Sequence, residues 1–240
     1  MERSKGRKAK ALAEVAFVFV ALFITAALIG LVAGSLPKRF ATPVQALALW
    51  GAIGAGALML RREGRNFGAL GMRRPRSWRD TLVWAAIGLV AALAGSVGLG
   101  EAIKNLTDWP PLDVSYIRNS LEGDTFVWAT WMLLVVWGSA AFGEELLSRG
   151  FVLDRFRQAF GESTVALGWA TVLQAVIFGL LHTVQGPTGV VITAYVGLVF
   201  AAVYIASGWN LWAAILAHGI ADSVSLTLIY AGLPLPGYIS

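Results

Sequence analysis

The sequence of 240 residues contains no cysteine and only two histidines, His182 and His218. The missing cysteine excludes disulfides, thiolate metal ligands and cysteine nucleophiles. Charged residues make up only 14% of the chain and hydrophobic residues 57%, whereas an ordinary soluble domain has about 25% charged residues. This composition excludes a soluble globular domain, a disordered chain and a disulfide scaffold. The few polar side chains that remain must therefore carry whatever chemistry the chain performs.

Long uncharged runs predict helices that cross a membrane, because a bilayer core about 30 Å thick needs about 20 apolar residues per helix. Residues 163–221 contain no Asp, Glu, Lys or Arg, and polar or helix-breaking residues divide this run near 183–187 and 207–210. We expect an all-α polytopic membrane protein with about seven spans, within a range of six to eight, and with a core from the last four. The chain then has a basic tail, 1–14, and one membrane domain, 15–240. The predicted helices are 15–37, 40–60, 81–100, 125–160, 163–182, 188–207 and 211–229.

A signal peptide is the alternative interpretation of the first run, since five basic residues precede it. Its apolar part is about twice the 7–15 residues usual in a signal peptide, and Lys38 and Arg39 follow it. We therefore interpret residues 15–37 as a retained helix.

The distribution of basic residues predicts the orientation. If the N-terminus is cytoplasmic, the inner segments hold 15 of the 19 lysines and arginines, and the outer segment 101–124 is acidic. The positive-inside rule therefore favours a cytoplasmic N-terminus. The net charge of +5 then reflects topology, and its partners are anionic lipid headgroups rather than nucleic acid.

Two adjacent carboxylates, Glu144 and Glu145, follow a tryptophan-rich apolar run. On a helix, Glu145 and Arg149 share one face and can pair, while Glu144 points elsewhere. The alternative is an interfacial charge cluster that ends a span, with Arg149 as a cytoplasmic anchor.

Both histidines lie in apolar helices. His182 ends one helix, and His218 stands four residues before Asp222 in another. A carboxylate at this spacing can fix the tautomer of an imidazole. The alternatives are a hydrogen-bonded packing histidine and a structural polar pair. A glutamate with two imidazoles can also activate water for hydrolysis. The sequence contains neither a G-x-S-x-G elbow nor an H-E-x-x-H zinc motif.

Three motifs in order resemble a known family: Glu144-Glu145-x-x-x-Arg149-Gly150, Phe178-x-x-x-His182 and His218-x-x-x-Asp222. They are similar to the signature of the CAAX protease and bacteriocin-processing (CPBP/Abi) family of intramembrane proteases. The resemblance covers residues 125–225, and the first three spans carry no family motif. It implies peptide-bond hydrolysis within or at the membrane. Eukaryotic members remove the last three residues of prenylated CaaX proteins, and others are linked to bacteriocin processing or immunity.

The resemblance also implies a role for each motif residue. Glu144 would be the general base on water, and His182 would position and polarise that water. His218 and Asp222 would stabilise the oxyanion or orient the substrate carbonyl, and orienting His218 suits an Asp222 carboxylate better. Glu145 with Arg149 would hold the glutamate helix in place.

The metal question stays open at this point. The family has been described both as metalloproteases and as metal-independent glutamate proteases. Two histidines and a glutamate from three helices can hold one divalent ion such as Zn²⁺ with an open position, or they can act on water directly.

A shared site requires Glu144 and His182 at the same depth, so the chain must reverse near Gly161. We therefore expect the glutamate helix to continue past Arg149, with a kink at Gly150. On this continuation Asp154, Arg155 and Arg157 would face water. Glu144 and Glu145 would lie below the membrane surface in a polar cavity.

Two other classes of function use the same residues. A proton-coupled transporter would also need buried Glu, His and Asp, but the sequence has no inverted repeat with broken helices in both halves. A membrane scaffold or immunity protein would keep the motifs without catalysis. The expected partners are a peptide or protein substrate at or in the membrane and the lipid bilayer, with no nucleic acid and the oligomeric state open. The expected location is the plasma membrane of a prokaryote.

Overall fold

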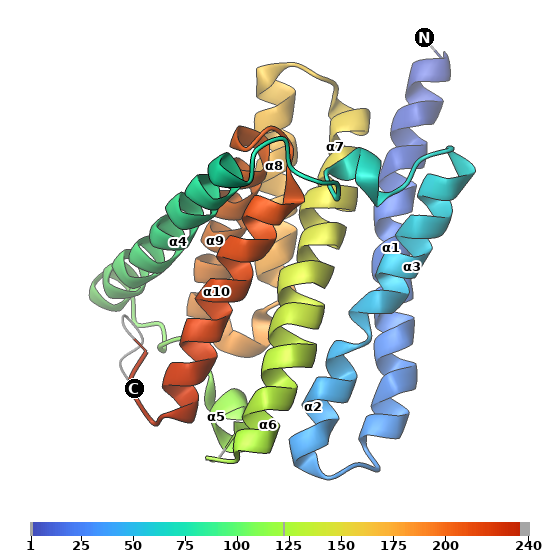
Figure 1. Cartoon of the computed structure of the whole chain (residues 1–240). Coiled ribbons are helices and arrows are strands. Elements are labelled where there is room, and N and C mark those ends of the chain that lie inside the picture. Colours follow the sequence, from blue (N-terminus) through green and yellow to red (C-terminus); the bar gives the residue numbers. More distant parts are fainter. Residues whose placement is uncertain (1, 122, 236–240) are drawn as a thin grey trace.

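The computed structural model describes residues 2–121 and 123–235, and within these ranges it contains helices and no β-strand (Figure 1). The α-helices are α1 (Glu2–Ala33), α2 (Lys38–Ala46), α3 (Leu49–Arg62), α4 (Trp78–Leu106), α5 (Ser115–Leu121), α6 (Thr125–Thr130), α7 (Leu153–Phe160), α8 (Thr164–Leu180), α9 (Gly186–Ala206) and α10 (Leu211–Tyr230). A π-helical segment, η2 (Trp131–Val152), joins α6 to α7, and two short 3₁₀ turns are η1 (Phe67–Leu70) and η3 (Thr183–Gln185).

In the part of the chain that the structure describes, six helical segments are long and apolar enough to cross a membrane, and α8 is a shorter apolar helix. The six are Gly6–Ala33, Arg39–Arg62, Trp78–Leu106, Thr125–Phe160, Thr183–Ala206 and Leu211–Tyr230. This confirms the prediction of an all-α polytopic membrane protein with about seven spans.

The structure moves several predicted boundaries. The first helix begins at Glu2 rather than at residue 15, so the basic tail is helical, and it ends at Ala33. The predicted helix 40–60 is divided into α2 and α3, and α5 had no counterpart in the prediction. Side-chain caps explain other starts, because Ser77, Asp124, Ser163 and Asn210 each accept a hydrogen bond from a backbone N–H in the first turn of the following helix.

The glutamate motif lies on a continuous helical rod, Thr125–Phe160, formed by α6, η2 and α7. The rod runs through Gly150 without a break. It ends at Gly161, whose φ of 107° lies in the left-handed region that favours glycine. The chain reverses there, and Ser163 begins α8. The motif helix and the first histidine helix are therefore neighbours that run in opposite directions.

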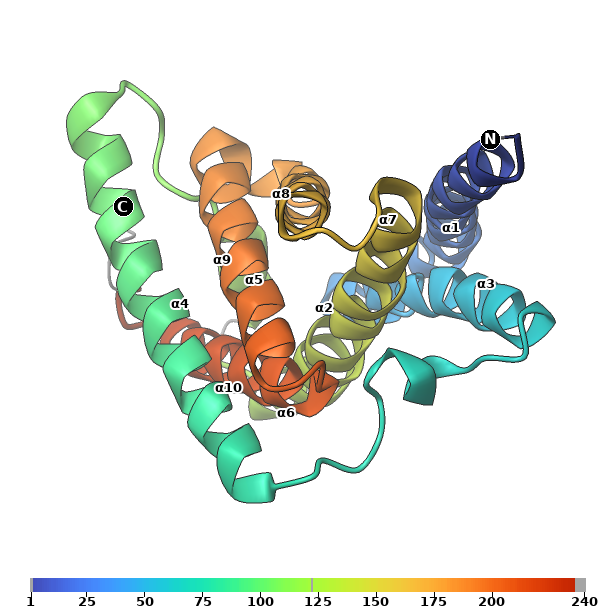
Figure 2. The same ribbon diagram turned by 90° about the horizontal axis from the view of Figure 1, so that it is seen from above.

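The rod separates two groups of helices (Figures 1 and 2). Helices α1 and α3 lie on one side, and α8, α9 and α10 lie on the other, with α4 crossing outside α9 and α10. The α7–α8 turn lies at the same end of the molecule as the N-terminus, and α5 and α6 lie at the opposite end (Figure 1). We call these the N-terminal end and the opposite end.

A cluster of charged side chains at the N-terminal end corrects one prediction. Arg155 is fully buried, and its guanidinium lies 2.7 Å from Glu14, 3.1 Å from Glu63 and 2.9 Å from Asp154. Arg65 completes this Arg155 cluster by pairing with Asp154 at 2.8 Å. The prediction that Arg155 faces water was wrong, because α1 and the segment after α3 cover α7 and supply the counter-charges.

The neighbours of Arg155 on α7 are partly buried as well. Asp154 is half-buried, and Arg157 is half-buried with its guanidinium 4.0 Å from the centre of the Trp209 ring. The amphipathic continuation of the rod is thus covered by other parts of the protein rather than by water.

Candidate active site

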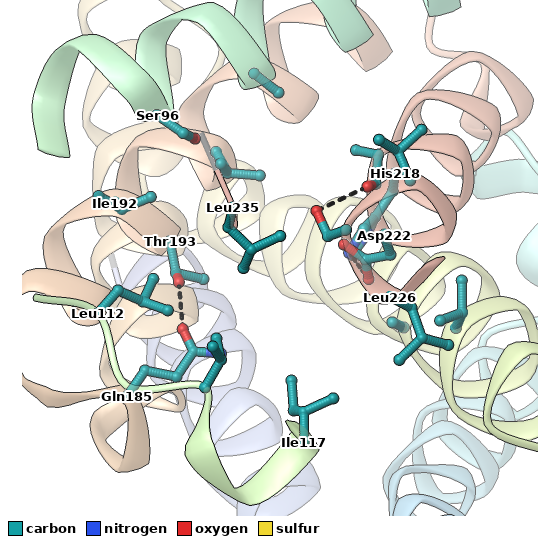
Figure 3. Close-up of a pocket in the computed structure, with 18 of the residues that line it drawn as sticks. Ser96, Leu112, Ile117, Gln185, Ile192, Thr193, His218, Asp222, Leu226 and Leu235 are labelled. Atoms are coloured by element: carbon teal, nitrogen blue, oxygen red, sulfur yellow. Dashed lines mark hydrogen bonds and ion pairs between the residues drawn. The ribbon is translucent and has the colours of Figure 1, made fainter. Parts of the chain in front are cut away.

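A cavity of about 390 Å³ lies where the three motifs meet. Glu144, His182, His218 and Asp222 all line it. In Figure 3, His218, Asp222 and Leu226 of α10 lie on one side of the cavity, and Leu112, Gln185, Ile192 and Thr193 lie on the other. Most of the lining residues are apolar, so the expectation of a polar cavity was wrong, and the polar side chains are confined to a few places on the walls.

The two adjacent glutamates have different surroundings. Glu144 is half-buried and lines the cavity, and no residue in the described part of the chain donates a hydrogen bond to it. Glu145 is fully buried and does not line the cavity, contrary to the prediction that both would. Its Oε1 lies 2.9 Å from Nη1 of Arg149 and 2.9 Å from Nδ1 of His218. One carboxylate is thus held by two basic side chains, and the other is open to the cavity.

His218 lies between two carboxylates. Its Nδ1 faces Glu145, and its Nε2 lies 3.3 Å from Oδ2 of Asp222. The ring packs on Phe200, with ring centres 5.0 Å apart. The i, i+4 contact with Asp222 matches the spacing seen in the sequence, whereas the contact with Glu145 was not predicted.

The ring of His182 is oriented by a backbone carbonyl at the end of α8. Its Nδ1 lies 2.8 Å from the carbonyl oxygen of Phe178. Because a carbonyl only accepts hydrogen bonds, Nδ1 carries the proton, and in the neutral ring Nε2 keeps its lone pair. This leaves Nε2 able to accept a hydrogen bond from a water molecule.

Arg149 connects the first motif to the second. It is fully buried, its guanidinium lies 4.2 Å from the centre of the Phe178 ring, and its Nη2 donates to the carbonyl of Gly197 at 3.3 Å. A buried guanidinium is tolerated when a carboxylate balances its charge, as Glu145 does here. A stacked aromatic ring adds a cation–π attraction.

Several lining residues were not predicted. Gln185 and Thr193 lie next to each other on one wall of the cavity, and Thr193 Oγ1 donates a hydrogen bond to Gln185 Oε1 at 3.3 Å. Behind the glutamate helix, the buried side chain of Gln174 donates to Ser148 Oγ at 2.8 Å. The only sequence signal for these residues was an uncharged polar side chain in an apolar helix, which is too common to select a site.

The predicted ligand set does not fit a divalent metal ion. Both ring nitrogens of His218 face carboxylates, so this ring has no nitrogen free for a metal. Among residues 2–121 and 123–235, no three His, Asp or Glu side chains are arranged to hold a metal ion. The residues present therefore do not provide the two-histidine, one-glutamate site.

The fold and the cavity define a polytopic helical membrane protein in which the ionisable groups of the three motifs meet at one internal site. Residues 126–224 match the family described as type II CAAX prenyl endopeptidase Rce1-like, and this segment contains all three motifs. The match is to this segment of the chain, and it confirms the resemblance drawn from the motifs. The match indicates a CAAX-type membrane protease. Comparisons with curated proteins and with solved structures gave no match.

Proposed function

We propose that this protein is an intramembrane endopeptidase that hydrolyses a peptide bond with a water molecule activated by Glu144. The observation that carries the proposal is the difference between the two glutamates. Glu145 is committed to Arg149 and His218, whereas Glu144 lines the same cavity as His182 without a partner among the described residues.

In the proposed reaction, Glu144 takes one proton from the water molecule. At the same time the oxygen of this water attacks the carbonyl carbon of the substrate. The new C–O bond forms, and the electrons of the carbonyl double bond move to its oxygen. When this intermediate collapses, the C–N bond breaks and Glu144 returns the proton to the leaving amine. Nε2 of His182 accepts a hydrogen bond from the other O–H of the water, and this fixes the direction of attack.

His218 is the donor we propose for the oxyanion. Its Nε2 faces the cavity side of α10, where its contact to Asp222 is 3.3 Å and the Asp222 side chain is 39% exposed. A substrate carbonyl that displaces this carboxylate would receive the N–H instead. Glu145 holds the other nitrogen, so it acts as a positioning residue for His218.

The cavity favours an apolar peptide segment. No lysine or arginine in the described part of the chain lines it, and its walls are mostly aliphatic and aromatic. Such walls bind a hydrophobic stretch of polypeptide by burial of apolar surface. They offer no cationic side chain to a free C-terminal carboxylate, so we propose cleavage within a chain.

The test is cleavage of a pool of internally quenched peptides with apolar cores by the purified protein in detergent. We expect Glu144→Gln to lose at least about 100-fold in rate, since general-base catalysis contributes about 10²–10⁴-fold, while its thermal unfolding stays unchanged. Glu162→Gln, exposed at the turn before α8, is the matched control and should keep full activity.

Two outcomes would contradict the proposal. Full activity in Glu144→Gln would remove Glu144 as the base. No cleavage by the wild-type protein would favour the scaffold or transporter functions that the same residues allow.

A further inference from the structure

The two ends of the molecule differ in charge, because one is strongly basic and the other is nearly balanced. The N-terminal end holds seven arginines within residues 61–79, in addition to the basic residues at the start of α1 and on α7. Among the residues that the structure describes, the opposite end has four basic residues, Lys38, Arg39, Lys104 and Arg118, and four acidic residues, Glu101, Asp108, Asp113 and Asp124. At Asp113, hydrogen bonds from Ser115 lower the carboxyl pKa below its ordinary value.

The cavity reaches the opposite end. Part of its wall comes from the segment 112–117, and other parts come from Gln185 and Leu235, which follow α8 and α10 at that end. The segment before α5 is held against this wall, because Thr188 Oγ1 donates to the carbonyl of Pro110 at 2.6 Å and the N–H of Asp113 donates to the carbonyl of Gln185 at 3.1 Å.

The side towards the N-terminal end is closed. Every residue from Glu145 to Leu153 on the rod is buried. Arg149, Gln174 and Phe200 are fully buried behind the histidines. A water molecule or a peptide therefore reaches Glu144 from the end that carries α5 and not through the N-terminal end.

We infer that the cavity opens on the side of the membrane away from the cytoplasm, because the basic end of a membrane protein faces the cytoplasm. Together with the proposed protease function, on which it rests, this direction of opening assigns the class of substrate. The substrate is an exported or membrane-anchored polypeptide whose apolar segment enters from the outer side. A protein confined to the cytoplasm does not reach Glu144.

The absence of cysteine from the sequence makes a direct test possible with single cysteine substitutions. Asn119→Cys reports on the opposite end, Glu162→Cys on the N-terminal end, and Ser225→Cys on the cavity wall; the first two sites are exposed. Intact cells are treated with a small, charged, membrane-impermeant methanethiosulfonate, and the remaining thiols are counted with a maleimide in detergent.

We expect Asn119→Cys and Ser225→Cys to be blocked in intact cells, and Glu162→Cys to be blocked only after the cells are opened. Thr193→Cys, on the other wall of the cavity, repeats the measurement in case one variant does not fold. Blocking of Glu162→Cys in intact cells would overturn the inference. So would cavity cysteines that react only from the cytoplasmic side, or from neither side.

The labelling does not depend on catalysis, so it gives the same pattern in the Glu144→Gln background even if the protease proposal fails. The substrate class is tested with quenched peptides that the purified protein cleaves. These should be cleaved when added to intact cells and spared by sealed inverted vesicles, and the reverse result would overturn the assignment.

Discussion

Nδ1 of His218 lies 2.9 Å from Oε1 of Glu145, although 73 residues separate them in the sequence. The same oxygen lies 2.9 Å from Arg149. A single buried carboxylate thus joins the glutamate helix to α10 and balances the guanidinium that stacks on Phe178 of α8. The three motifs converge on Glu145, while Glu144 remains available to the cavity.

Removing Arg149 should destabilise the protein strongly. In Arg149→Ala, the Glu145 charge would lose its guanidinium partner in a fully buried place, which costs about 3–5 kcal/mol. The measurement is the free energy of unfolding in a detergent titration. Glu144→Gln is the control and should unfold like the wild-type protein. Wild-type stability in Arg149→Ala would show that the pair does not hold the helices together.

The proposed use of Nε2 of His182 can be separated from the role of Nδ1. In His182→Asn, the side-chain amide can still donate to the carbonyl of Phe178, but nothing replaces Nε2. We expect the protein to fold and to lose roughly 100-fold in cleavage rate. The side chain in His182→Gln is one methylene longer than in His182→Asn, so its amide reaches towards the Nε2 position. Part of the activity should therefore return in His182→Gln. Equal rates in His182→Asn and the wild type would exclude a contribution of Nε2.

Close packing of α8 against α9 predicts a contrast between two glycines of α8. A Cβ at Gly179 would lie 2.5 Å from the carbonyl oxygen of Val190 and 2.8 Å from the Cβ of Ala194. Gly179→Ala should therefore cost about 1–3 kcal/mol. At Gly168 no atom lies within 4 Å of an added Cβ, so Gly168→Ala should be neutral or stabilise the helix by up to about 1 kcal/mol. Unfolding titrations of both variants provide the test, and equal stability would contradict the packing.

The Arg155 cluster predicts a loss of stability in acid. Burial raises the pKa of Glu63, but the hydrogen bond from Lys10 and the charges of Arg155, Lys10 and Arg65 lower this pKa below its ordinary value overall. A carboxyl with a lowered folded-state pKa stabilises the protein above its unfolded pKa, and the contribution disappears as the pH falls through the folded pKa. Stability should thus decline below about pH 4.3, the ordinary glutamate value.

The variant Glu63→Gln should be less stable than the wild type at pH 7 and should lose less stability on acidification. Melting temperatures in detergent between pH 3 and pH 7 measure the difference. Glu162→Gln should follow the wild-type profile, because this side chain is exposed. Parallel profiles for Glu63→Gln and the wild type would exclude a role for Glu63.

Helices and local pairs could be predicted from the sequence because both depend on neighbouring residues. Uncharged runs indicated the spans, and the i, i+4 spacing indicated the pairs Glu145–Arg149 and His218–Asp222. The contact of Glu145 with His218 could not be predicted, because it depends on how η2 and α10 pack. The same holds for Gln185 and Thr193, which become cavity residues only through the fold.

Arg155 shows why charge alone misleads about exposure. Its position on α7, among other charged residues, indicated a solvated face. Its burial depends on Glu14 and Glu63, which lie far away in the sequence and reach it only because α1 packs on α7 and Glu63, directly after α3, lies against it. Periodicity within one helix contains no information about such partners.

The Arg155 cluster also links the motif-bearing half of the chain to its N-terminal helices. The family segment 126–224 contains Arg155 but neither Glu14 nor Glu63. Cut from the first three helices, that segment would expose a guanidinium with two of its three carboxylates missing. The motif-bearing half is therefore not a transplantable module, and any recombination that exchanges the N-terminal helices must bring two acidic side chains to the same place.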